Sequence, residues 1–279
     1  MKKIYIPLIC LFISGIAFSQ TPGKIKLANG HKIVVESSTE IQASLAMGME
    51  LNSNSNSVNA LEVKSSTDKD LTISNTLTKI KVNMTMMGQP NNYDSENKEG
   101  NNEEMAKIFD EKMNKAVDVV VDNTTGIAVA ETKKEKKADP EAENPADDLM
   151  KMFSDNSDNG LVSGAFEIIP KGKSPGDSWS DTAIAKDMKM IRTYTLRSIT
   201  GNEAVIQVDV VSTGVNKLDF QEMEFEVKTE TKTKGEIFAD PNTGLVSKRT
   251  SSSEISGSIQ MMGQDMPISA KTTSTNIYK

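Results

Sequence analysis

The sequence predicts a mainly β fold of the α+β class: an antiparallel sheet from two related halves, with one or two amphipathic helices. Short stretches of alternating apolar and polar residues occur along most of the chain. The clearest is 222–229, where Met223, Phe225 and Val227 alternate with charged side chains, as in a sheet with one dry face and one wet face. Two motifs, Asp-x-x-Thr-Gly at 122–126 and 240–244 and Met-Met-Gly-Gln at 86–89 and 261–264, each occur once in each half.

Residues 1–19 have the features of a signal peptide. Lys2 and Lys3 precede an almost wholly apolar run over 4–13, and Ala17 and Ser19 place small residues where a signal peptidase cleaves. We expect cleavage after Ser19 and an exported protein, periplasmic or secreted. The apolar run is shorter than the roughly 20 residues that span a bilayer, and no later run approaches that length, so we expect no transmembrane segment.

The composition of the mature chain limits its partners and its chemistry. Loss of Lys2 and Lys3 takes the formal net charge from −7 to −9 (30 basic against 39 acidic residues), which disfavours nucleic acid and anionic membranes. The single cysteine, Cys10, leaves with the peptide, and Pro7-Leu8-Ile9 before it lacks the small residues of a lipid attachment site. We therefore expect no disulfide and no cysteine ligand in the mature protein.

The first half, residues 20–132, reads as strands with one helix. Alternating or β-branched runs predict strands at 32–36, 41–51, 61–63, 71–73 and 76–87, and the Asn/Ser tract at 52–57 predicts a polar loop. Residues 103–117 change to helical spacing, and this helix is expected to pack on the sheet. Its apolar face is formed by Met105, Ile108, Phe109, Met113 and Ala116.

Residues 133–160 predict a charged linker that contains a short helix. The run from 133 to 143 is almost entirely charged or small and has little to bury. Asn144 and Pro145 have the residue types of a helix start, and Asp155–Gly160 is expected to break the chain. The apolar side of this helix would be Leu149, Met150, Met152 and Phe153.

The second half, residues 161–279, has the clearer strand patterns. A turn at 175–179 delivers Trp179, the only tryptophan, and 194–199 and 204–211 form a hairpin around Gly201. Strands are then expected at 222–229, on both sides of the turn at 240–244, and over 268–278.

These motifs resemble a family of secreted Bacteroidetes proteins that is a domain of unknown function. The resemblance rests on Gly176-Asp177-x-Trp179, on Gly235-x-Ile237-Phe238-x-Asp240-x-x-Thr243-Gly244 and on Met261-Met262-Gly263-Gln264. It covers most of the mature chain. It implies an exported β-rich domain, similar to the large curved sheet with helices on its concave face in periplasmic lipoprotein carriers. It implies no catalytic residues.

Few residues point to catalysis or to metal binding. His31 is the only histidine, and one histidine without cysteine or a nearby acid cluster does not make an ordinary zinc site. A pair of acids doing glycosidase work stays open, because pairing is invisible in a sequence. Asp240-x-Asn242-x-Gly244 and 155–160 contain oxygen ligands for calcium, but the distant bidentate acid of a calcium loop is missing, so we favour turns.

The methionines, 16 in all, form the main candidate binding surface, since aromatic residues make up only 5% of the chain. Copper(I) binding, plain core packing and an adaptable apolar groove are the three interpretations, and copper is disfavoured because adjacent methionines in a strand face opposite sides. A groove would lie between the two methionine motifs. Its candidate residues are Met84, Met86, Met223, Phe225, Met261 and Met262.

The expected function is that of an exported, non-enzymatic binding or carrier-type protein for a hydrophobic ligand, such as a lipid or acyl chain. The rival interpretation is a structural or interaction protein of the cell envelope. A hydrolase is third. No cofactor, metal or catalytic residue is predicted.

Overall fold

The computed structural model describes residues 24–25, 27–45, 48–129, 158–185, 188–220, 223–261 and 264–279, without the side chains of 185, 216–220, 223–225 and 261. The predicted signal peptide, most of the predicted linker and its helix at 144–153 therefore lie outside the described residues.

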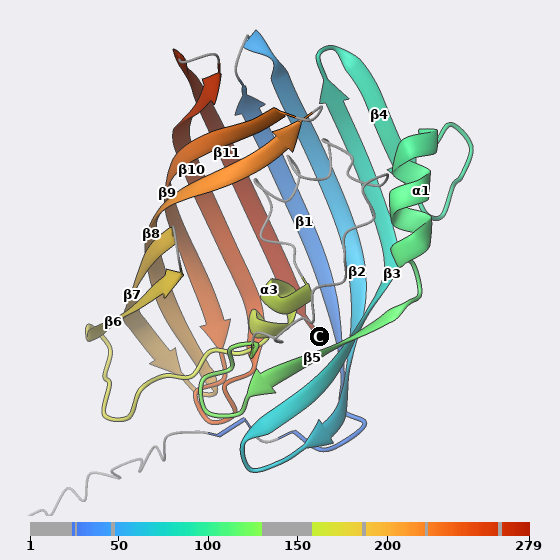
Figure 1. Cartoon of the computed structure of the whole chain (residues 1–279). Coiled ribbons are helices and arrows are strands. Elements are labelled where there is room, and N and C mark those ends of the chain that lie inside the picture. Colours follow the sequence, from blue (N-terminus) through green and yellow to red (C-terminus); the bar gives the residue numbers. More distant parts are fainter. Residues whose placement is uncertain are drawn as a thin grey trace, which may run out of the picture.

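Eleven antiparallel strands of the described chain form one open sheet (Figure 1). Their order is β4-β3-β2-β1-β11-β10-β9-β8-β7-β6, and β5 pairs with Asp70–Thr76 of β3, on the same edge of β3 as β4. The mainly β prediction is confirmed. The strands are β1 (Lys32–Ser44), β2 (Glu50–Ser66), β3 (Asp70–Met86), β4 (Gln89–Asp94), β5 (Ala116–Asp122), β6 (Ser178–Ala185), β7 (Met188–Thr200), β8 (Glu203–Phe220), β9 (Met223–Ala239), β10 (Val246–Met261) and β11 (Gln264–Tyr278).

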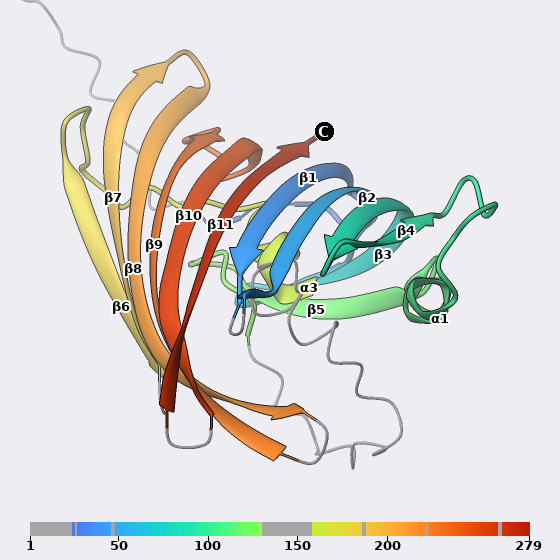
Figure 2. The same cartoon turned by 90° about the horizontal axis from the view of Figure 1, so that it is seen from above.

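The sheet consists of two meanders that meet in its middle. Strands β1 to β4 run outward in one direction, β11 back to β6 in the other, and β1 pairs with β11 from Val35↔Tyr278 to Ser44↔Ser269. Seen from above, the sheet curves strongly, and the helices α1 (Glu103–Lys112) and α3 (Asp158–Ser163) lie on its concave side (Figure 2).

The two faces of the sheet differ because side chains alternate along each strand. In β1, Ile33, Val35, Ile41 and Ala43 are buried, whereas their neighbours point to the outer face and are exposed or half-exposed. The outer face carries mainly Ser, Thr, Asn, Lys and Glu, which solvent can satisfy. The concave face therefore holds the core.

Two separate hydrophobic clusters occupy the concave face. The first cluster surrounds α3 and includes Val35, Val162, Phe166, Ile206, Ile237 and Tyr278. The second cluster lies nearer α1 and includes Ile41, Ala43, Leu51, Met84, Ile255 and Ala270, with Tyr93 of β4 and Met105 of α1. The larger contacts of the two helices are with β3, β4 and β5, so most of the concave face has no described helix over it.

Both helices differ from the sequence prediction at their ends. Helix α1 starts as predicted, with Asn102 accepting hydrogen bonds from the backbone N–H groups of Glu104 and Met105. It ends at Lys112, before the predicted 117, because Asn114 adopts a left-handed conformation (φ 59°) and the chain then enters β5. Helix α3 begins at Asp158, where a break was predicted; Leu161 and Val162 are buried in it.

The first methionine motif is a turn and not the end of a strand. Met86 pairs with Gln89, and Met87 and Gly88 between them both have positive φ (53° and 75°), which is a two-residue type I′ hairpin. Met87 is 64% exposed. The second motif ends β10 and begins β11 with the matching pair Met261↔Gln264.

The two Asp-x-x-Thr-Gly motifs form the same turn. In each, the glycine N–H donates to the aspartate backbone oxygen, at 2.9 Å for Gly126 and 2.8 Å for Gly244. The turns hold the segment after α3 from two sides, because Gly126 abuts Phe166 and Gly244 abuts Ile168. The methionine motif precedes the aspartate motif in the first half and follows it in the second. The two motifs therefore do not repeat in the same order, and each encodes a local turn.

Candidate functional site

A continuous polar band crosses the concave face between the two hydrophobic clusters. The registers of β9, β10, β11, β1 and β2 place three rows of inward side chains side by side, all of them Ser, Thr, Asn or Arg apart from Ile237, Gly235 and Ile41. We call this the polar band. Its polar members are Arg249, Asn276, Ser37 and Ser57; Ser251, Ser274, Thr39 and Ser55; and Thr233, Ser253, Thr272 and Ser53.

Several polar atoms of the band are buried without a hydrogen-bond partner. Ser37 Oγ, Asn276 Oδ1 and Arg249 Nε share this property, and the three residues are direct cross-strand neighbours on β1, β11 and β10. Each such group costs about 1–3 kcal/mol. By contrast, the buried Asn59 donates to Asn75 Oδ1 at 2.9 Å, and Asn75 donates to Asp158 at 2.7 Å. Four of the five such atoms that the described residues hold lie in the band, the fourth being Ser53 Oγ, and the fifth is Asn123 Oδ1 in a turn.

Two ion pairs lie on the concave face beside the band. Arg249 Nη2 is 3.1 Å from Glu167 Oε2, and Arg192 Nε is 2.7 Å from Asp181 Oδ1. Burial raises the pKa of Glu167, and Arg249 acts in the opposite direction. Burial also raises the pKa of Tyr194, which stacks on Trp179 at 5.4 Å, to about 12. Glu167 and Asp181 thus each pair with an arginine, so the net charge of each pair is close to zero.

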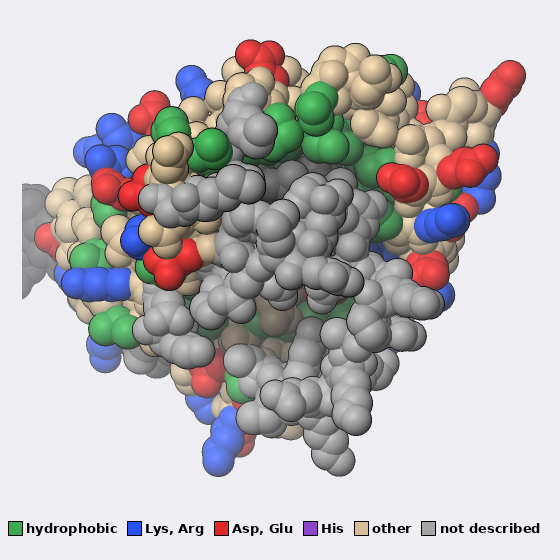
Figure 3. Space-filling view, turned by 45° about the horizontal axis from the view of Figure 1, so that its top comes forward, with side chains coloured by type: hydrophobic (Ala, Val, Ile, Leu, Met, Phe, Trp, Pro, Cys, Tyr) green, Lys and Arg blue, Asp and Glu red, His purple; other side chains and the backbone are tan. Residues whose placement is uncertain are grey.

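An apolar row borders the band on the other side. Ile255, Ala270, Ala43 and Leu51 are consecutive cross-strand partners, and Met86 continues the row on β3. On β10 and β11 the apolar surface extends to Ile259 and Met266, which pair directly and are half-buried. Figure 3 shows apolar side chains gathered along the upper rim of the molecule and charged ones toward its margins.

The residues of the predicted methionine groove are placed as follows. Met84 is buried in the second cluster, and Met86 packs on its edge. Met223 and Phe225 lie on β9 and Met261 ends β10, but their side chains are outside the described residues, as is all of Met262. The end of β3 next to β4 and the end of β10 next to β11 lie at the same end of the sheet (Figure 1). The groove stays a prediction.

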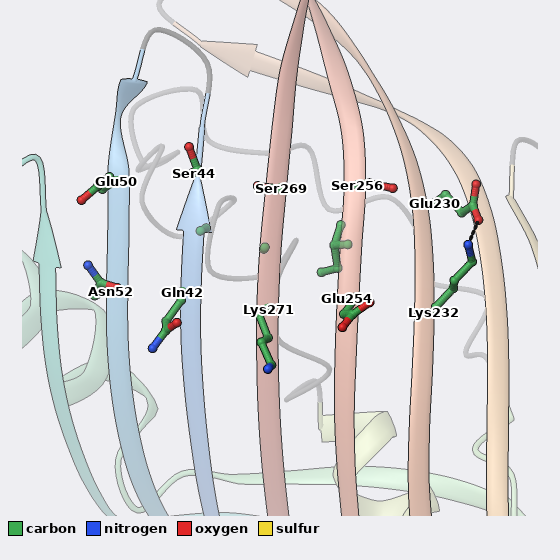
Figure 4. A pocket seen from close by; sticks show the side chains of 13 residues that line it. Gln42, Ser44, Glu50, Asn52, Glu230, Lys232, Glu254, Ser256, Ser269 and Lys271 are labelled. Carbon is green, nitrogen blue, oxygen red and sulfur yellow. Dashed lines mark ion pairs between the residues drawn. The ribbon is translucent and has the colours of Figure 1, made fainter.

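The outer face carries a separate open hollow of about 610 Å³. Figure 4 shows its side chains standing on β2, β1, β11, β10 and β9, with Gln42, Lys271 and Glu254 across the centre. Lys232 and Glu230 form an ion pair of 2.9 Å at one side. The hollow contains exposed polar groups that solvent satisfies, so it offers less to a ligand than the band does.

The other sequence candidates are found in turns. His31 is exposed, and its backbone N–H donates to the backbone oxygen of Ala28. Asp240 Oδ1 accepts from the Asn242 N–H at 2.7 Å, the bond of a backbone turn. Among the described residues, no group of three His, Cys, Asp or Glu side chains is placed to hold a metal ion.

Sequence reasoning missed the polar band and assigned part of it wrongly. Residues 52–57, predicted to be a polar loop, form the middle of β2, with Ser53, Ser55 and Ser57 facing inward. Residues 37–40 were left between two predicted strands, although β1 is continuous there. The available signal was the strict Asn–Ser alternation, which has the period of a strand.

The fold and the band together define an open, curved antiparallel-sheet protein with a partly polar, partly apolar concave surface. Within the described part of the chain, no helix has the length and hydrophobicity to cross a membrane. The chain belongs to a family of unknown function (DUF6263), which matches residues 68–246. No curated protein sequence matches it.

Three solved structures share a distant likeness in fold. A lipovitellin structure concerned with lipid–protein interactions is 11% identical, covers 91% of this chain and has a TM-score of 0.47. This chain spans 25% of the lipovitellin chain. Pseudomonas aeruginosa OccK5 (OpdH) is 6% identical over 90% of this chain and 98% of its own, with a TM-score of 0.26. An outer membrane channel from Pseudomonas putida F1 is 8% identical over 92% and 98%, with a TM-score of 0.27.

Proposed function

We propose that the protein is an exported, non-enzymatic binding or carrier protein that holds a hydrophobic ligand, such as a lipid or acyl chain, on the concave face. The observation that carries this proposal is the apolar row across β10, β11, β1 and β2 beside the polar band, in which Ser37 Oγ, Asn276 Oδ1 and Arg249 Nε are unpaired. Together they match a molecule with an apolar chain and a polar end, since an apolar surface with a few placed polar groups is typical of ligand sites.

The test is ligand uptake by the full-length mature protein after delipidation. Fluorescent acyl lipids should bind with a saturable signal, and organic extract of protein purified from its native source should contain a co-purifying lipid by mass spectrometry. Ile259→Glu, which places a charge on the half-buried apolar surface, should weaken uptake. Ser258→Glu, one residue along on the outer face, should not. Absence of uptake where a known lipid carrier binds would overturn the proposal.

One observation supports the alternative of an interaction protein of the cell envelope. On the outer face near the edge strand β6, four apolar side chains are exposed: Ile184 (75%), Ile191 (38%), Val211 (45%) and Val215 (38%). Exposed apolar groups next to an unpaired strand edge favour protein contacts. Retention of an envelope protein on immobilised wild type but not on Ile184→Lys, without any extractable lipid, would support this alternative.

A further inference from the structure

Three of the four unpaired atoms of the polar band lie together at one point of the concave face, and the fourth, Ser53 Oγ, lies farther along β2. Asn276 pairs with Ser37 on one side and with Arg249 on the other, so their side chains are adjacent on the same face. Ser37 is 6% exposed. A native protein satisfies most of its buried polar atoms, and a cluster of unsatisfied ones therefore needs an explanation.

The chemistry of these atoms selects the group that fits. Arg249 Nε can only donate, Asn276 Oδ1 can only accept, and Ser37 Oγ can do both. A carboxylate or phosphate only accepts and would leave Asn276 Oδ1 unpaired. An ammonium only donates and would leave Arg249 Nε unpaired. A hydroxyl group both donates and accepts, so it can pair with all three atoms. It would also fit if Asn276 presented its amide nitrogen, a donor, in place of Oδ1.

The charge of the surroundings leads to the same class of group. Glu167 already pairs with Arg249 at 3.1 Å, and Asp181 pairs with the other inward arginine, Arg192, at 2.7 Å. An anionic ligand would meet no free arginine there and would have to displace a buried carboxylate. A cationic ligand would face two guanidinium groups. An uncharged ligand disturbs neither pair.

We propose that Ser37, Asn276 and Arg249 form a subsite for an uncharged, hydroxyl-bearing head group, of the glycerol or sugar type. This subsite rests on the proposed function, since it holds the polar end of the same amphipathic ligand. The acyl chain would then lie toward Ala43, Ala270 and Ile255. On one strand, same-face residues are roughly 7 Å apart. Asn276 and Ala270 are six positions apart on β11, so the distance from head to chain is about 20 Å.

The experiment compares ligands that share one acyl chain and differ in the head group. Binding of 1-hexadecanoylglycerol, hexadecyl glucoside, hexadecanoate and hexadecylamine, whose chains are long enough to reach Ala270, is measured by calorimetry on the full-length mature protein, with free glycerol and glucose as chain-free arms. We expect the two neutral amphiphiles to bind at least about tenfold more tightly than the two charged ones, and the chain-free arms to bind weakly. The better of the two neutral ligands identifies the glycerol or sugar type.

The variants separate a binding role from a structural one. Ser37→Ala should weaken binding of the neutral amphiphiles about fivefold, which corresponds to the loss of one neutral hydrogen bond, and leave hexadecanoate binding unchanged. It should also raise the Tm of the unliganded protein by a few degrees, because it removes an unpaired buried hydroxyl. Asn276→Leu should likewise weaken binding of the neutral amphiphiles and raise the Tm of the unliganded protein. Ser38→Ala, on the outer face of the same strand, should change neither quantity.

Each outcome is decisive. Equal binding of hexadecanoate and 1-hexadecanoylglycerol, or unchanged affinity in Ser37→Ala, would overturn the subsite while leaving the carrier function standing. Tight binding of free glucose would overturn the assignment to a lipid head group. If no amphiphile binds, both the subsite and the proposed function fail.

Discussion

The ion pair between Glu167 and Arg249 gives a sharp test of how the concave face is stabilised. The side chains are 11% and 26% exposed, and the Nη2–Oε2 distance is 3.1 Å. At this distance, Coulomb's law with an effective dielectric constant of about 20 gives roughly 5 kcal/mol of attraction. Removing one partner of a buried pair costs roughly 3–5 kcal/mol. Because Arg249 is partly exposed, we expect Arg249→Met to lower the free energy of unfolding by about 3 kcal/mol at neutral pH.

The loss should depend on pH in a defined direction. Burial raises the pKa of Glu167, and removing Arg249 should raise that pKa further. A group whose folded-state pKa exceeds its unfolded value of about 4.3 binds more protons when folded. Its destabilising effect is therefore absent below the unfolded pKa and grows as the pH rises through the folded pKa. Arg249→Met should be much closer to wild type at acid pH than at neutral pH.

Urea unfolding at pH 4 and pH 7.5 measures both effects, and about 3 kcal/mol corresponds to a Tm shift of roughly 6–12 °C. Glu167→Gln combined with Arg249→Met should recover much of the loss, since the unpaired charge is gone. Arg197→Met is the control, because Arg197 is exposed and, within the described residues, its side chain donates to the uncharged Gln207. An equal loss at both pH values, without recovery in the double variant, would refute the reasoning.

Three further predictions concern the turns. Gly244→Ala should lower the free energy of unfolding by about 2–3 kcal/mol, because the φ of Gly244 is 73° and a Cβ would lie 2.5 Å from Ile168 Cδ1. Gly201→Ala is the control: its φ is also positive, but the space around it is open, so the loss should be about 1 kcal/mol. Thermal unfolding of both variants measures the difference. Asp122→Ala should cost about 1–2 kcal/mol by losing the bonds from Thr124 and Thr125; these bonds lower the pKa of Asp122, so the difference from wild type should fade as the pH falls through that lowered value. Met87→Asn should stabilise by about 0.5–1 kcal/mol, because Asn-Gly suits a type I′ turn, whereas Met87→Val should destabilise; unchanged urea midpoints for both would contradict the turn assignment.

Local structure was predictable where residue type determines backbone geometry. Asp-x-x-Thr-Gly specifies a turn through an aspartate side chain that bonds to nearby N–H groups and a glycine with positive φ, and both copies form it. The start of α1 follows from Asn102 for the same reason. The pairing of β1 with β11 joins residues as far apart as Thr39 and Ser274, which are 235 positions apart. Nothing in either strand alone specifies that partner.

The polar band was unpredictable for a different reason. Strand recognition relies on apolar residues at every second position, and the band places Ser or Thr at those positions. Ser37 and Thr39 therefore look like surface residues, and Ser53, Ser55 and Ser57 look like a loop, although all five face inward. The same substitution of polar for apolar residues that hides these strands in the sequence also creates the candidate site in the structure.

The band also has an energetic meaning for the whole fold. Each inward serine of β1 and β2 gives up apolar burial worth about 0.8 kcal/mol for every methylene that a larger side chain could bury. Unpaired atoms such as Ser37 Oγ add their own cost. A sequence under selection for stability alone would close this gap with valine or isoleucine, as it does at Val35 and Ile41 on either side. Local rules are broken in this way mainly at functional sites, because binding needs groups that the free protein leaves unsatisfied. The band is therefore the part of the sheet whose sequence is least explained by folding, and the ligand that we propose would account for it.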